Sequence, residues 1–85
     1  MVRPLMTDLM DDLAYQIHDF LLAESVPFKG GHLVFIPVTA LVDKFKRNHR
    51  TINRRLLALK DDGLLEPLIR KNNGTLYWVK EQDED

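Results

Sequence analysis

A run of cations near the middle of the chain is the part of the sequence whose residue types point most directly to a chemistry. Between residues 44 and 55 there are six lysines and arginines and one histidine, with no carboxylate. Closely spaced cations of this kind attract polyanions such as the phosphates of nucleic acid. These residues are Lys44, Lys46, Arg47, His49, Arg50, Arg54 and Arg55. The sequence therefore predicts a local basic surface.

The net charge of −1 and the pI near 6.3 conceal this basic surface. Residues 1–42 are acidic, and the last five residues, EQDED, add further carboxylates. We expect residues 81–85 to form a solvated acidic tail, either a solubilising end or a competitor of phosphate for the basic surface. Binding depends on the local field, so the near-neutral total does not exclude a nucleic-acid partner.

The remaining polar residues do not form a recognisable catalytic or metal-binding motif. His18, His32 and His49 are fourteen and seventeen residues apart, which gives no ligand pair, and the absence of cysteine excludes thiolate zinc sites and thiol nucleophiles. Ser25 lacks a nucleophile elbow, and Gly30-Gly31 lacks the sequence of a phosphate loop. We expect no enzyme activity, no metal and no cofactor.

Helical periodicity and capping residues predict the elements that carry the cations. Thr7 can cap a first helix that extends to about Glu24, and its apolar stripe consists of Leu9, Met10, Leu13, Ala14, Ile17, Phe20 and Leu21. Residues 33–36, LVFI, have the composition of one short strand. Pro37 suits the first turn of a helix over residues 38–46.

A third helix and a hairpin complete the predicted order. Asn48 can cap a helix over residues 49–61, in which Ile52, Leu56 and Leu59 form the buried stripe and Gly63 ends the helix in a left-handed turn. LEPLIRK and TLYWVK then flank the pair Asn73-Gly74, which favours a type I′ hairpin turn. The predicted class is α+β, mainly α with a small β-hairpin.

This order resembles a winged helix-turn-helix domain of the bacterial, archaeal, phage or plasmid regulator type. RNHRTINRRLLALKDDGLLEPL is similar to the recognition-helix pattern of that family, and IRKNNGTLYW resembles its wing. The resemblance implies one domain over residues 1–80, with helix 49–61 in the major groove of DNA and the 70–76 wing on the backbone or in an adjacent groove. It also implies a sequence-specific double-stranded DNA-binding protein that acts as a transcriptional regulator in the cytoplasm, associated with the nucleoid.

The helix geometry assigns roles to the polar residues. At 100° per residue, Arg50 and Arg54 lie almost opposite the apolar stripe and Asn53 lies beside them, so these three are the candidates for reading base edges. The others are expected to contact phosphate or to support the helix start. The complete set of predicted DNA-binding residues is Lys44, Lys46, Arg47, Asn48, His49, Arg50, Thr51, Asn53, Arg54, Lys71, Asn72 and Asn73.

Some residues leave alternatives open. Arg55 points to the flank of the helix and either binds DNA or pairs with an acidic residue of the first helix, and Leu57 falls unexpectedly on the outward side. Tyr77 and Trp78 are expected to pack the hairpin onto the body of the domain. The alternative functions are a protein-interaction or assembly module of the same fold, and a DNA-binding factor in plasmid or phage replication or partition.

A chain of 85 residues is expected to bury a small core and to gain stability from self-association. Some apolar residues lie on the acidic side of the first helix. Their position favours a homodimer through this helix, which would read paired half-sites on DNA. The candidates for this contact are Leu5, Met6, Tyr15 and Leu22. No apolar run approaches the length of a membrane span.

Overall fold

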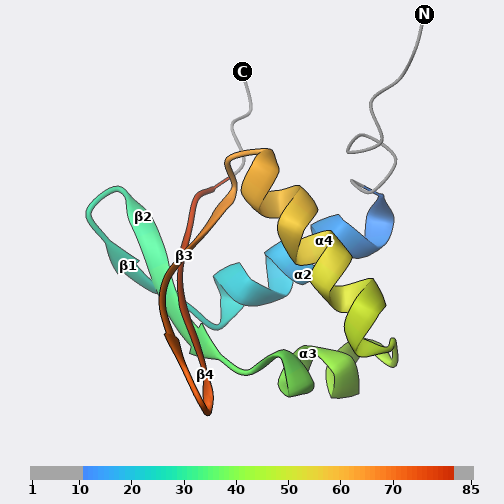
Figure 1. Cartoon of the computed structure of the whole chain (residues 1–85). Coiled ribbons are helices and arrows are strands. Elements are labelled where there is room, and N and C mark those ends of the chain that lie inside the picture. The colour runs from blue at the N-terminus through green and yellow to red at the C-terminus, as the bar shows by residue number, and fades with distance from the viewer. Residues whose placement is uncertain (1–10, 82–85) are drawn as a thin grey trace, which may run out of the picture.

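The computed structural model describes residues 11–81 as three helices and one antiparallel sheet of four strands (Figure 1). The helices lie on one side of the sheet, whose strands are arranged in the order β1-β2-β4-β3. The elements in chain order are α2 (Asp12–Ala23), β1 (Val26–Phe28), β2 (Gly31–Ile36), α3 (Val38–Phe45), α4 (His49–Asp61), β3 (Leu65–Lys71) and β4 (Gly74–Val79). The α+β class is confirmed, but the sheet is larger than the single hairpin that the sequence predicted.

Helix α2 begins at Asp12, with the side chain of Asp11 accepting a hydrogen bond from the amide of Ala14 at 3.1 Å. This corrects the predicted helix start at Thr7, because Asp11 has an extended backbone (φ −100°, ψ −171°) through which a continuous helix cannot run. Thr7, Leu9 and Met10 themselves lie outside the described residues. The rest of the predicted stripe is confirmed, because Leu13, Ala14, Ile17 and Leu21 are buried and Phe20 packs against the core. His18 is buried as well, although the sequence did not predict it in the core.

A hairpin formed by β1 and β2 corrects the prediction of one short strand. Val26 pairs with Leu33 and Phe28 with Gly31, so the two-residue connection is Lys29-Gly30. Both residues have positive φ, 49° and 81°, as a type I′ turn requires. Pro27 pairs with His32 within β1, and β1 is an edge strand, the position in a sheet that tolerates a proline.

Helices α3 and α4 form where the sequence predicted them. The side chain of Asn48 accepts a hydrogen bond from the amide of Thr51 at 2.8 Å, which caps α4. At the other end Gly63 has φ 83°, and the amides of Gly63 and Leu64 donate to the carbonyls of Lys60 and Leu59 at 3.0 Å. This pair of bonds is a Schellman motif, which confirms the left-handed end. Pro37 is the N-cap of α3 rather than a first-turn residue.

The hairpin of β3 and β4 is present, but its predicted turn is wrong. Lys71 pairs with Gly74, so the connecting residues are Asn72 and Asn73. Neither asparagine has positive φ, which excludes a type I′ turn, and Gly74 belongs to β4 with φ 153°. A register shift between Pro67 and Ile69 also bends β3.

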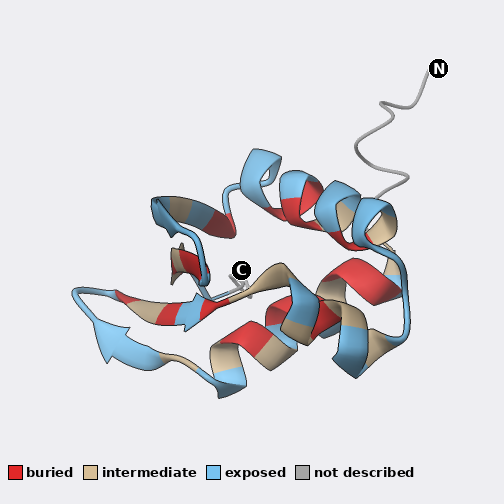
Figure 2. Cartoon of the chain, turned by 60° about the horizontal axis from the view of Figure 1, so that its bottom comes forward, coloured by how far each residue is buried: buried red, intermediate tan, exposed pale blue. Residues whose placement is uncertain are grey.

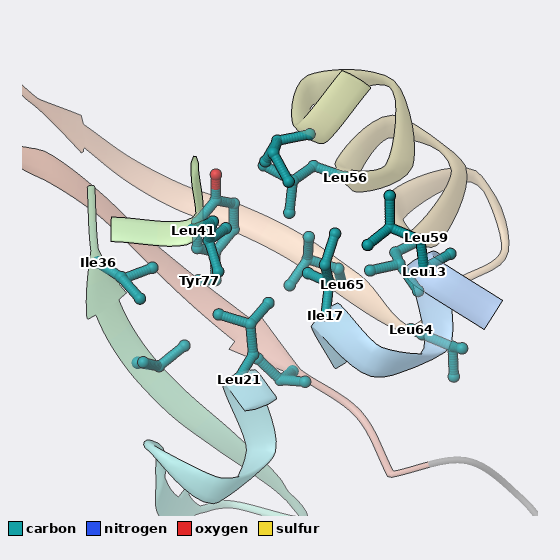
Figure 3. Packing of buried hydrophobic residues seen from close by; sticks show 14 residues of the cluster. Leu13, Ile17, Leu21, Ile36, Leu41, Leu56, Leu59, Leu64, Leu65 and Tyr77 are labelled. Carbon is teal, nitrogen blue, oxygen red and sulfur yellow. The ribbon is translucent and has the colours of Figure 1, made fainter. Parts of the chain in front are cut away.

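The core lies between the helices and the inner face of the sheet, where the buried residues of every element except β1 meet (Figure 2). Figure 3 shows side chains from α2, β2, α3, α4, β3 and β4 converging there. Tyr77 belongs to this core, as predicted, whereas Trp78 is only partly buried and lies over Gly31 of β2. The core members are Leu13, Ala14, Ile17, Leu21, Val34, Ile36, Leu41, Ile52, Leu56, Leu59, Leu64, Leu65, Tyr77 and Val79. Docking α4 into this core fixes which of its polar residues face outward.

Candidate nucleic-acid interface

The outward face of α4 carries the residues that the sequence assigned to base reading. Ile52, Leu56 and Leu59 are buried against the body of the domain, as predicted. Arg50, Asn53 and Arg54 are consequently exposed. In the described part of the chain neither Arg50 nor Arg54 forms an ion pair, so both guanidinium groups are available to a ligand.

A cleft separates α4 from the β3–β4 hairpin and encloses about 950 Å³. It brings Asn53 of the helix together with Lys71, Asn72 and Asn73 of the hairpin. These four residues belong to the predicted set, and eighteen positions of the chain separate Asn53 from Lys71. The fold therefore assembles part of the predicted site on one concave surface.

Two further cations line this cleft, and the sequence analysis did not include them. Lys60 lies seven positions after Asn53, about two helical turns further along α4. Arg70 precedes Lys71 on the hairpin. The period of α4 could have indicated Lys60, and the RKNN run could have indicated Arg70. None of the described residues that line the cleft is an aspartate or glutamate, so its field is positive.

The apolar part of the cleft includes Leu57, which is 57% exposed. This confirms the unexpected outward position of Leu57. Tyr77 also lines the cleft, where burial raises the pKa of its hydroxyl. Its phenol therefore stays neutral over the physiological range and can both donate and accept a hydrogen bond.

A different part of the predicted set lies on the other side of α4. Arg47 and Thr51 line a shallow depression together with Asp11, Asp12 and Arg55. The carboxylates of α2 and its cap thus lie beside these two residues and compete for their hydrogen bonds. The predicted residues do not form one continuous surface, and this second group is the less suited to an anion.

Arg55 is held in an ion pair rather than presented to a ligand. Its Nη2 donates to Oδ2 of Asp11 at 2.7 Å and its Nε donates to Oδ1 at 3.3 Å. This confirms the alternative that Arg55 pairs with an acidic residue at the first helix. The hydrogen bond from Arg55 is the largest of the effects that hold the pKa of Asp11 below its ordinary value of 3.8.

The cations before α4 have separate positions. Lys44 belongs to the last turn of α3, with its Nζ 5.3 Å from the ring centre of Phe20. Lys46 caps α3 in the left-handed conformation, with φ 59°. Neither residue lines the cleft. Asn48 and His49 form the exposed start of α4. The side-chain oxygen Oδ1 of Asn48 already accepts the capping hydrogen bond from the amide of Thr51.

Over residues 11–81 no three histidine or acidic side chains are arranged to hold a metal ion. The buried ring of His18 donates from Nε2 to the carbonyl of Lys80 at 2.7 Å, which ties α2 to the end of β4. His32 Nε2 lies 2.9 Å from a carboxylate oxygen of Glu81, so the first residue of the predicted tail contacts the sheet. Residues 82–85 lie outside the described residues.

The residues predicted to form a homodimer through the first helix are half-buried in the domain or lie outside the described residues. Leu22 packs partly against the core, and Tyr15 is half-buried. Leu5 and Met6 lie outside the described residues. The described side of α2 therefore offers only a small apolar surface to a partner.

Comparison of the chain with protein families, with curated proteins and with solved structures found no match. None of the described helices is long and apolar enough to cross a membrane.

Proposed function

We propose that this chain is a winged helix-turn-helix protein that binds double-stranded DNA in a sequence-specific manner and regulates transcription. In this proposal α4 enters the major groove, and the hairpin of β3 and β4 acts as the wing on the adjacent backbone. The protein acts by occupying its site on DNA.

The observation that carries the proposal is the cleft shared by α4 and the hairpin. Asn53 and Lys60 line it from the helix, and Arg70, Lys71 and the two asparagines of the turn line it from the hairpin. Donors on two walls of one concave surface suit the phosphate groups that border a groove. With no carboxylate in its lining, the cleft offers these donors without an internal competitor.

The outward face of α4 supports direct reading of bases. A helix of thirteen residues is about 20 Å long, and the major groove of B-DNA is about 12 Å wide and admits an α-helix. Arg50 and Arg54 lie near the N-terminal half of this helix, whereas Asp61 and Asp62 are at its C-terminal end. We therefore assign base contacts to the N-terminal half of α4.

The experiment begins with duplexes selected from a random library, because no binding site is known beforehand. Affinity for a selected duplex and for an unselected one is then measured by fluorescence anisotropy over a range of salt concentrations. Six to ten phosphate contacts would weaken binding by roughly a thousand- to a hundred-thousand-fold between about 50 and 200 mM salt. Failure to enrich any duplex, or binding that ignores salt, would contradict the proposal.

Three variants separate base reading from phosphate binding. Arg50→Ala and Arg54→Ala should reduce the preference for the selected duplex by about 1–3 kcal/mol per residue, while Lys71→Ala should weaken both duplexes equally. Lys80→Gln is the matched control, because it removes an exposed lysine that follows β4 and does not line the cleft. Equal losses on both duplexes for the two arginine variants would show that base reading is wrongly assigned.

A second candidate function is a protein-interaction or assembly module, which the exposed Leu57 favours. On a helix that lies in the major groove, the base contact open to a large apolar side chain is the methyl group of thymine. Leu57→Gln distinguishes the two candidates. If the chain binds DNA, Leu57→Gln changes the affinity only for duplexes with thymine at the contacted position. If the chain is an assembly module, neither the wild type nor the variant shows salt-dependent binding of any duplex.

A further inference from the structure

The sheet has a second face that the helices do not cover. The strand registers place Leu33 beside Trp78 and Val26, and Phe35 beside Leu76. Because side chains alternate between the two faces of a strand, these residues lie opposite the buried Val34, Ile36 and Tyr77. We call the following set the outer-sheet face: Val26, Phe28, Leu33, Phe35, Ile69, Leu76 and Trp78.

Four members of the outer-sheet face are large apolar residues with substantial exposure. Val26 is 60% exposed, Ile69 50%, Phe28 46% and Phe35 45%. They come from β1, β2 and β3, and β1 and β3 are the two edges of the sheet (Figure 1). The exposed apolar residues therefore extend across the sheet. Single exposed apolar residues are ordinary, but a contiguous set on one face marks a site of interaction.

Two glycines keep this surface flat. A Cβ atom added to Gly31 would lie 2.3 Å from the indole ring of Trp78, and one added to Gly74 would lie 2.9 Å from the ring of Phe35. Each ring therefore packs against the backbone of a glycine in the neighbouring strand and does not project from the sheet. A flat apolar sheet face is the surface that packs against a second sheet, about 10 Å away.

We propose that the outer-sheet face binds the same face of a second copy of this chain and forms a two-fold symmetric homodimer. Four large apolar residues of this face are 45–60% exposed, and they extend from one edge of the sheet to the other, as a small specific interface of about 1,200 Å² in total requires. The predicted dimer thus uses the sheet in place of the first helix. This inference does not depend on DNA binding.

The charges at the rim of the outer-sheet face favour a second copy over other partners. Lys29 follows β1 at one edge of the sheet, with its Nζ 5.7 Å from the ring centre of Phe28. Glu66 lies on β3 at the opposite edge, in register with Trp78. A two-fold axis parallel to the strands places the β1 edge of one copy over the β3 edge of the other. The lysine of one copy and the glutamate of the other then lie along the same edge, three strand positions (about 10 Å) apart in register, and this attraction occurs once at each edge.

A single strand of nucleic acid is the other occupant that exposed aromatic rings suggest. Stacking platforms combine such rings with a positively charged groove. Here four of the seven residues are aliphatic, and Glu66 shares the face with the rings. The composition therefore favours a protein surface, and the nucleic-acid alternative is tested below.

Sedimentation equilibrium of the full chain over about 1–300 µM tests the proposal, since an interface of this size implies a micromolar Kd. The expected result is a shift from 9.9 kDa to twice that mass. Ile69→Lys should abolish the shift. Leu57→Lys is the matched control, because Leu57 is similarly exposed but lies on α4, and it should leave the dimer unchanged.

The rim charges provide a test that a misfolded variant cannot imitate. Glu66→Lys and Lys29→Glu should each raise the dimer Kd by about three- to tenfold, and the double variant should restore it. Val26→Lys replaces Ile69→Lys if that variant does not fold, because Val26 is at the edge of the sheet and is still more exposed.

Three results would overturn the proposal. The first is a monomer at every concentration, and the second is a dimer that Ile69→Lys or Val26→Lys does not weaken. In this second case, a dimer that only Tyr15→Lys weakens would place the interface on α2. The third is quenching of the only tryptophan, Trp78, by a single-stranded oligothymidine that also dissociates the dimer, because it would assign the face to nucleic acid.

Discussion

Replacement of Asp11 tests two contacts that join the start of α2 to α4. Its carboxylate accepts from the amide of Ala14 at 3.1 Å and from the guanidinium of Arg55 at 2.7 Å. Loss of an N-cap typically costs about 1 kcal/mol. The ion pair contributes about 0.5 kcal/mol, because the Asp11 side chain is 40% exposed and solvent screens the charges. Asp11→Ala should therefore lower the free energy of unfolding by about 1.5 kcal/mol.

Asp11→Asn separates the two contributions, because asparagine also caps helices well but carries no charge. It should cost only about 0.5 kcal/mol. For a domain of this size these values correspond to decreases in Tm of about 6–12 °C for the alanine variant and about 2–4 °C for the asparagine variant. Thermal unfolding followed by far-ultraviolet circular dichroism at low salt measures both.

The dependence on pH follows from the direction of the pKa shift. The bond from Arg55 lowers the pKa of Asp11 in the folded protein below the ordinary value of 3.8. The ion pair therefore stabilises the fold above pH 3.8, and this contribution is lost as the pH falls through the lower, folded pKa. The wild type and Asp11→Asn should differ near neutral pH and converge once the pH has fallen below the folded pKa of Asp11.

Two outcomes would refute this reasoning. Equal destabilisation by Asp11→Ala and Asp11→Asn would show that the cap contributes nothing. A difference between the wild type and Asp11→Asn that persists in acid would show that its source is not the charge. Asp19→Asn is the control, since Asp19 is an exposed residue of the same helix that forms no ion pair with another described residue, and it should not change the Tm.

The remaining predictions concern the sheet and the orientation of α4. Gly31→Ala should displace the Trp78 indole, shift its fluorescence and cost about 1–3 kcal/mol, whereas Gly30→Ala should cost about 1–2 kcal/mol through its left-handed φ and leave the emission unchanged. Unchanged emission in Gly31→Ala would contradict the contact. Leu56→Ala should cost about 2–5 kcal/mol in denaturant unfolding, and Leu57→Gln within about 0.5 kcal/mol. A larger loss for Leu57→Gln would mean that α4 is rotated from its described position.

Helix α4 was predicted in full because its signals are local. Asn48 caps the first turn through a residue three positions later, and Gly63 ends the helix through carbonyls three and five positions before the donating amides. The leucine and isoleucine spacing then assigned the buried face, and hence the exposed position of Arg50 and Arg54. All of these interactions connect residues within about two turns of one another.

Strand β1 was missed because its pairing is not visible within its own three residues. Val26, Pro27 and Phe28 carry no alternating pattern and remain exposed, and they form a strand only because β2 lies beside them. The hairpin turn was misplaced for a related reason. Pairing of β3 with β4 aligned Lys71 with Gly74, and this register placed the connection at Asn72 and Asn73.

The sequence by itself determined both ends of α4, the buried faces of the helices, and that the cations from 44 to 55 are free of neighbouring carboxylates along the chain. The tertiary structure decided how those cations are divided. It paired Arg55 with Asp11, 44 positions away, and it joined α4 to a hairpin to create the cleft. Capping and periodicity act between near neighbours, whereas an ion pair or a cleft between distant segments depends on how the elements dock, which no local pattern encodes.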